Sequence, residues 1–164
     1  MRLHGLLTTL SFLLLAGTSS ATHPKAPKAP GLEYLYNANI TAGEIVVVGQ
    51  VPRGLRAVAA ITGGQFAGPK FKGTILPLGG DWELIDANGT ITIDVRQTFK
   101  TDDGAVIQIF ETGSTQTDGT GHVRLTFETG SKKYYWINSI VGIAIIRGLG
   151  PNTLTIDAWQ MTAP

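Results

Sequence analysis

Hydrophobic and polar residues alternate along most of this chain with the two-residue period of a β-strand. In residues 90–100 the hydrophobic positions are all odd-numbered, and the positions between them are mainly polar or charged. Residues 121–129 repeat this pattern. The two apolar faces consist of Ile91, Ile93, Val95 and Phe99 in the first segment, and of Val123, Leu125 and Phe127 in the second. Each predicted strand therefore has one apolar and one polar face.

Similar segments, about ten in all, follow one another with turn-forming residues between them. Gly, Asn and Asp occupy these turns, for example at residues 79–80, 88–89 and 101–104. A helical turn is expected only around residues 132–136. Strands joined by short turns predict an all-β protein, either a sandwich or a closed antiparallel barrel. The predicted strands span residues 32–41, 44–51, 56–62, 64–75, 80–84, 90–100, 105–112, 121–129, 135–147 and 153–161.

The first 31 residues do not follow the alternating pattern. A polar start, a Leu-rich core at residues 6–16 and small residues before position 22 predict a cleavable signal peptide over residues 1–21. A buried N-terminal helix is the alternative interpretation. Residues 22–31 contain three Pro and two Lys, which favours an extended linker over a docking peptide. The β-domain then covers residues 32–164, and the protein is expected to be secreted or to reside in the endomembrane lumen.

Composition excludes several kinds of site. The chain has no Cys, so it can form neither disulfides nor thiolate metal sites. Its net charge is +1, with 15% charged residues, which gives no basic surface for nucleic acid. His122 is the only His of the predicted domain, and no cofactor motif is present. We therefore expect no metal, no cofactor, no nucleic-acid partner and no membrane span after removal of the signal peptide.

Two tripeptides match the N-glycosylation sequon. They begin at Asn39 and Asn88. Asn88 is the better candidate, because Asn88–Gly89 also reads as an exposed hairpin turn.

The remaining candidate chemistry consists of carboxylates and aromatic residues near strand ends. A carboxyl group in an apolar cavity has a raised pKa and can transfer protons without a cofactor. The alternative is structural: the Trp side chains fill the interior, and the acids form ion pairs on a solvated outer face. The candidates are Asp81, Trp82, Asp94, Arg96, Glu128, Tyr135, Trp136 and Asn138.

Six motifs in order resemble the family called domain of unknown function 3237. They begin with ITGG-x-F-x-GP at residues 61–69 and G-x-x-LP-x-GG-DW at residues 73–82. D-x-R at residues 94–96, TDDGA, FETG and Y-x-x-N follow. The sequence departs from the family pattern at Gln97, where an aromatic residue is usual, and at Ile137, where Leu is common. Its signal peptide is also unusual for the family.

The resemblance implies a single antiparallel β-barrel of about eight to ten strands, similar in architecture to the allene oxide cyclase and dirigent barrels. Barrels of this kind commonly hold a small molecule in the interior or at the mouth. The family's activity is not established, so the resemblance supports the fold more strongly than any function.

Two functions follow from this interpretation. The first is a cofactor-free isomerase or cyclase of specialised metabolism, with Glu128 or Asp81 transferring a proton. Arg96, Tyr135 and Asn138 would bind oxygen atoms of the substrate. Asp94 would also contact the substrate, and Trp82 and Trp136 would form apolar walls around it. The second is a non-catalytic secreted carrier or effector that binds a small molecule. If the interior is polar, the apolar strand faces need a cover, and a homo-oligomer is expected.

Overall fold

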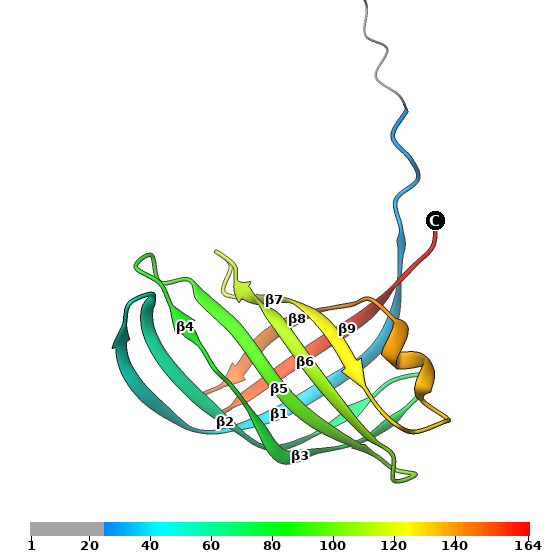
Figure 1. The fold of residues 1–164 in the computed structure, drawn as a ribbon, viewed down its shortest axis with the longest axis horizontal. Helices are drawn as coiled ribbons and strands as arrows, with labels where there is room; N and C mark the ends of the chain where they lie inside the picture. The colour runs from blue at the N-terminus through cyan, green and yellow to red at the C-terminus, as the bar shows by residue number, and fades with distance from the viewer. Residues whose placement is uncertain (1–24) are drawn as a thin grey trace, which may run out of the picture.

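The structure is a computed structural model that describes residues 25–164. The predicted signal peptide lies outside the described residues. Residues 25–30 are exposed and have no regular structure, and Figure 1 shows them leading away from the sheet. Within the described part of the chain, no helix has the length and hydrophobicity needed to cross a bilayer.

The described chain folds as antiparallel β-structure, which confirms the predicted all-β class. A single 3₁₀ helix, η1 (Tyr135–Ser139), interrupts the strands of residues 25–164. The strands are β1 (Gly31–Val51), β2 (Gly54–Ala67), β3 (Lys72–Asp81), β4 (Leu84–Ile85), β5 (Ile91–Thr101), β6 (Val106–Thr115), β7 (Gly121–Glu128), β8 (Gly142–Gly150) and β9 (Thr153–Thr162).

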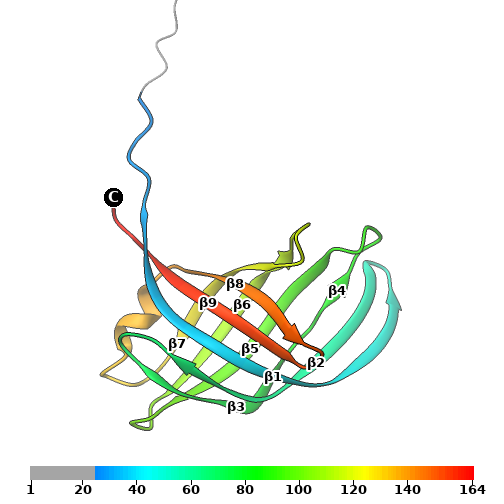
Figure 2. The ribbon, with the colours of Figure 1, turned by 180° about the vertical axis from the view of Figure 1, so that it is seen from behind.

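The strand pairings close the sheet into a ring. The order is β1-β9-β8-β7-β6-β5-β3-β2, and β2 pairs in turn with β1. β1 achieves this because it is 21 residues long: residues 31–41 pair with β9, and residues 37–51 pair with β2. The short β4 bridges β2 and β5. Figures 1 and 2 show the ring from opposite sides, with η1 at one end and the β1–β2 hairpin at the other.

Several predicted boundaries differ from the observed ones, mostly at irregularities. The segments predicted at 32–41 and 44–51 form one strand, because register shifts after Thr41 and Ala42 accommodate the extra residues. A turn predicted at Gly79–Gly80 lies inside β3, where the register with β5 shifts between Leu76 and Gly80. Such bulges bend a strand without ending it. The segment predicted as a strand at 135–147 begins instead with η1.

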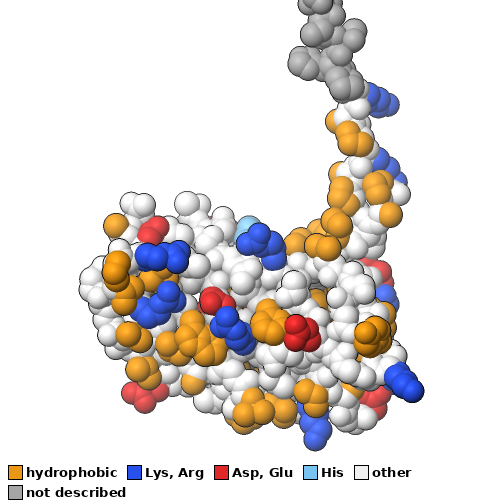
Figure 3. Space-filling view, in the orientation of Figure 1, with side chains coloured by type: hydrophobic (Ala, Val, Ile, Leu, Met, Phe, Trp, Pro, Cys, Tyr) orange, Lys and Arg blue, Asp and Glu red, His pale blue; other side chains and the backbone are white. Residues whose placement is uncertain are grey.

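The apolar strand faces point into the ring. Ile93, Val95 and Phe99 of β5 are buried, as are Val123, Leu125 and Phe127 of β7. Gln97 shares this inner face of β5 and is also buried, while the side chains of the opposite strand faces are exposed or half-buried. These side chains are therefore covered within one chain, and the polar strand faces carrying Arg96 and Glu128 lie outside. On the outer face seen in Figure 3, charges of both signs are dispersed among hydrophobic and neutral side chains.

Aromatic side chains fill the half of the ring nearest η1. Phe66 stacks on Phe99 with ring centroids 4.2 Å apart. Tyr36 meets Phe99 edge to face at 5.4 Å, and Phe71 packs between Tyr36 and Tyr134. Edge-to-face and offset-stacked pairs at such distances stabilise a core beyond the area they bury. This end of the ring is a packed core.

Replacing Phe99, which has no exposed surface, tests this packing. We expect Phe99→Ala to lower the free energy of unfolding by about 3–5 kcal/mol, because it leaves a cavity against Phe66 and Tyr36. The control Leu78→Ala, at a side chain that is 62% exposed, should change it by less than about 0.5 kcal/mol. Urea unfolding measures both, and equal effects would contradict the proposed core.

Candidate functional site

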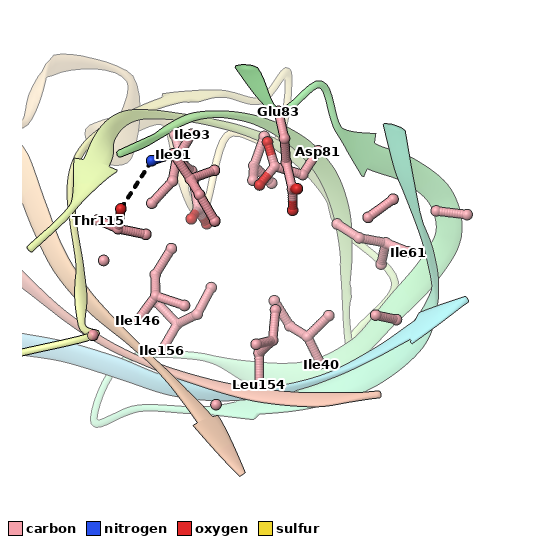
Figure 4. A pocket seen from close by; sticks show the side chains of 18 residues that line it. Ile40, Ile61, Asp81, Glu83, Ile91, Ile93, Thr115, Ile146, Leu154 and Ile156 are labelled. Atoms are coloured by element: carbon pink, nitrogen blue, oxygen red, sulfur yellow. Dashed lines mark hydrogen bonds between the residues drawn. The ribbon is translucent and has the colours of Figure 1, made fainter. Parts of the chain in front are cut away.

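A cavity of about 200 Å³ occupies the half of the ring away from η1. Its lining comes from every strand of the closed ring and is largely aliphatic. Figure 4 shows the Ile and Leu side chains converging on the open space, with Asp81 and Glu83 at one side. The apolar lining includes Ile40, Ile61, Ile91, Ile93, Ile146, Leu154 and Ile156.

Three carboxyl groups interrupt this lining. Asp81 ends β3, Glu83 lies in the short link to β4, and Glu111 belongs to β6. Asp81 and Glu111 both pair with Val95 of β5, so they stand in one row across three neighbouring strands. Strands lie about 4.8 Å apart, which places the two Cα atoms about 10 Å from each other. A small molecule in the cavity can therefore reach both carboxyl groups across the side chain of Val95, which also lines the cavity.

Backbone contacts hold the β3–β4 link that carries two of these acids. One carboxylate oxygen of Asp81 accepts the backbone N–H of Asp94 at 2.9 Å. The carbonyl of Glu83 accepts the N–H of Ala57 at 3.1 Å and the guanidinium of Arg56 at 3.3 Å. Arg56 also donates to the carbonyl of Trp82. The link is thus fixed from two sides, and the side chains of Asp81 and Glu83 reach the cavity.

Glu111 is fully buried among apolar residues. The side-chain amide of Gln97 donates a hydrogen bond to its Oε1, while its Oε2 has no partner among the described residues. Burial raises the pKa of Glu111 to about 8, the hydrogen bond from Gln97 lowers it in part, and the charge of Asp81 raises it further. Glu111 is therefore mostly protonated at neutral pH.

Asp81 has a different balance of forces. Burial raises its pKa to about 6, the N–H of Asp94 opposes that rise, and the charges of Glu83 and Asp94 add to it. Burial also raises the pKa of Glu83. At pH 7 Asp81 is mostly ionised while Glu111 keeps its proton. Two carboxyl groups whose pKa values lie on either side of neutrality can act as a base and an acid in one site.

Of the residues proposed from sequence, Asp81 alone lines this cavity. Trp82, Asp94 and Arg96 form a cluster on the outer face of the same strands. The guanidinium of Arg96 lies 3.3 Å from the carboxylate of Asp94 and 5.0 Å from the ring centroid of Trp82. This cluster lies on the reverse side of the sheet from Asp81.

The other proposed residues lie near η1. Glu128, Tyr135 and Asn138 line a shallow groove on the outer surface. The side chain of Asn138 binds both the N–H and the carbonyl of Thr129, at 2.8 and 3.0 Å, and so anchors η1 to the end of β7. Trp136 packs against the aromatic core, with Lys70 above its ring at 5.2 Å. The structure does not bring these residues to Asp81.

Sequence reasoning missed Glu111 and Glu83. The alternation contained a signal for Glu111, because it shares a strand face with Ile107 and Ile109, both fully buried. A carboxyl group in an otherwise apolar series predicts either a paired charge or a shifted pKa. Glu83 had no such signal, since its orientation depends on the backbone of a two-residue link.

Two further sets of predictions concern sequons and metals. Asn39 and Asn88 are both exposed, and Asn88 lies in the turn between β4 and β5. Their glycosylation stays a prediction. Among residues 25–164, no group of three or more His, Asp or Glu side chains is arranged to hold a metal ion.

A family model described as "Protein of unknown function (DUF3237)" matches residues 30–125. The chain belongs to the DUF3237 family. The match confirms the resemblance found from the motifs, and it includes Asp81, Glu83 and Glu111. It ends before Glu128.

Relatives within this fold include one named enzyme. The chain is 35% identical over 138 residues to the hydroalkoxylation enzyme phnH of Penicillium herquei, covering 82% of this chain and 86% of that protein. A crystal structure of an enzyme from Penicillium herquei superposes with a TM-score of 0.71 at 32% identity, covering 85% of this chain and 99% of that one. A β-barrel-like protein from Acinetobacter baumannii gives 0.76 at 29% identity, covering 85% and 100%.

The raised pKa of Glu111 makes a prediction about the stability of this DUF3237 protein. Glu111 binds its proton more tightly in the folded state, with a pKa of about 8, than at the ordinary value of 4.5. Its contribution to stability is therefore complete at low pH and is lost as pH rises toward 8, at up to about 1.4 kcal/mol per pH unit. Denaturant unfolding should show a steeper fall in stability between pH 5 and 8 for the wild type than for Glu111→Gln. Parallel curves would contradict the assignment.

Proposed function

We propose that this protein is an enzyme of specialised metabolism that closes a cyclic ether by intramolecular hydroalkoxylation. In this reaction a hydroxyl group adds across a carbon–carbon double bond of the same molecule. The observation that carries the proposal is the apolar cavity in which Glu111 is protonated and Asp81 is ionised. The 35% identity to a hydroalkoxylation enzyme supports the choice of reaction.

The two carboxyl groups match the two proton transfers that the reaction needs. Glu111 donates its proton to one carbon of the double bond, and positive charge develops on the other carbon. The hydroxyl oxygen forms the C–O bond there, and Asp81 accepts the hydroxyl proton. The product has the same formula as the substrate, with no net oxidation or reduction. A proton then passes from Asp81 to Glu111 to restore the starting state.

The aliphatic lining contributes by excluding water and by folding the substrate. Water would capture a cationic carbon and give an alcohol in place of the ether. An apolar cavity that fits the substrate holds the hydroxyl group close to the double bond, which removes much of the entropic cost of cyclisation. The Ile-rich lining favours a hydrocarbon portion for the part of the substrate that enters the ring. The predicted signal peptide adds the proposal that the reaction takes place along the secretory pathway or outside the cell.

The proposal is tested with a panel of alkenyl phenols and alkenols, including 2-(3-methylbut-2-enyl)phenol. We expect the wild type to form the cyclic ether and, in D₂O, to place one deuterium on the carbon that accepts the proton. Both Glu111→Gln and Asp81→Asn should lower kcat/KM by about 100-fold or more, the usual contribution of a general acid or base. Chromatography with mass spectrometry measures product and label.

Glu128→Gln is the matched control, because it makes the same chemical change on the outer face of the neighbouring strand. It should keep kcat/KM within about twofold of the wild type. Loss of activity in Glu128→Gln with retention in Glu111→Gln would place the chemistry in the outer groove. Binding of the panel without any conversion would favour a carrier.

A further inference from the structure

The cavity carries acidic groups without any matching base. Among residues 25–164, its lining contains three carboxyl groups and no Lys, Arg or His side chain. Many acidic side chains on the surface of the described chain, in contrast, form an ion pair with a Lys or Arg side chain. Such pairs join Lys70 to Glu33, Arg96 to Asp94, Lys72 to Asp102, Lys133 to Asp103 and Arg147 to Asp157.

Two of these carboxyl groups have an oxygen atom that accepts no hydrogen bond among the described residues, and of these two Asp81 is the one that is mostly ionised at neutral pH. Glu111 has no exposed surface, and its Oε2 faces no partner among the described residues. Asp81 accepts one backbone N–H, and its second carboxylate oxygen accepts no hydrogen bond from residues 25–164. Buried polar groups in folded proteins are nearly always partnered, and a bound ion, water or ligand is one explanation for a group that has no protein partner.

The opposite walls define the rest of such a ligand. They are aliphatic, with Ile40, Ile146 and Ile156 facing the side that holds Asp81 and Glu83 (Figure 4). The volume of about 200 Å³ exceeds the engineered apolar cavities of about 150 Å³ that bind benzene. A complementary molecule has a compact hydrocarbon body and a single positive charge at one end.

We propose that this cavity selects small hydrophobic monocations, and that it binds a protonated tertiary amine more tightly than a neutral molecule of the same size. The N–H of such an ammonium would donate to the free oxygen of Asp81, and its alkyl groups would contact the Ile side chains. The inference rests on the proposed function in one respect: the carbon that becomes positive during hydroalkoxylation would carry the same charge as the ammonium nitrogen and would lie at the same place in the cavity. An ammonium ion is then a stable mimic of that intermediate.

Cation binding and proton binding at the carboxylates are linked, so the affinity for a cation should depend on pH. A cation favours ionised carboxylates, so its affinity falls when they are protonated. As pH decreases through the pKa of Asp81, about 6, binding of an ammonium should weaken. An alkylamine with a pKa near that of lysine, about 10.4, stays protonated over this range, so the dependence belongs to the protein. A neutral ligand should lose no affinity over the same interval.

The test compares N,N-dimethylcyclohexylamine with 1-cyclohexylethanol, a neutral compound with the same number of non-hydrogen atoms. Isothermal titration calorimetry on the whole chain measures the Kd of each at pH 7.5 and at pH 5.5. We expect the amine to bind at least about tenfold more tightly than the alcohol at pH 7.5, as for a charge-assisted hydrogen bond. That advantage should shrink at pH 5.5.

Variants locate the effect. Asp81→Asn should remove most of the preference for the amine, while the alcohol binds as before and shows that the cavity is intact. Glu83→Gln serves in the same way if Asp81→Asn does not fold. Glu44→Gln removes a negative charge from an exposed position and should leave the preference unchanged.

Equal affinity for the two compounds, or an amine preference that survives both cavity variants, would overturn the inference. Either result is independent of turnover. A wild type that forms cyclic ethers but shows no preference for the amine would retain the proposed function and lose this inference. A wild type that prefers the amine but converts no alkenyl phenol or alkenol would lose the function and retain the inference.

Discussion

Closure of the sheet by β1 is the constraint on which the rest of the structure depends. β1 is long enough to pair with β9 along its first half and with β2 along most of its length. A closed ring has an inside that water reaches only through its ends, so most of its inward side chains have apolar neighbours. At the η1 end aromatic side chains fill this space, and at the other end the cavity remains. The same closure that makes a core therefore also makes a largely apolar compartment.

The chemistry of the site follows from where acids enter that compartment. Glu111 comes from the middle of the inner face of β6 and has one amide neighbour, so its neutral form is favoured. Asp81 comes from the end of β3, beside a bulge and a backbone N–H that favours its anion. The surroundings of Asp81 are more polar than those of Glu111, and this difference separates the pKa values of the two carboxyl groups. The cavity thus has an acid and a base although none of the described residues that line it is cationic. Because no cationic side chain neutralises the carboxylates, the cavity is complementary to a positively charged ligand.

Much of this architecture could be predicted from the sequence, and the exceptions have physical reasons. Alternation identified the strands and their faces, since Ile93, Val95 and Phe99 are buried together. It could not locate bulges, which add residues without changing the hydrophobic pattern, so the turn predicted at Gly79–Gly80 lies within β3. It also left open which faces point inward, because that depends on closure between strands distant in sequence. For this reason Asp94, Arg96 and Glu128 were predicted as site residues although they lie on the outer face. Glu111 could have been predicted as an inward-facing acid, because it alternates with the same period as Ile107 and Ile109.

The proposed chemistry of the cavity depends on a proton that Glu111 holds at neutral pH while Asp81 does not. Carbon-13 labelling of the Asp and Glu carboxyl groups, with assignment by Asp81→Asn and Glu111→Gln, lets NMR follow each group in the ligand-free protein. We expect titration of Asp81 near pH 6 and of Glu111 near pH 8. Titration of both near the ordinary value for a solvated carboxyl group, about pH 4, would contradict it.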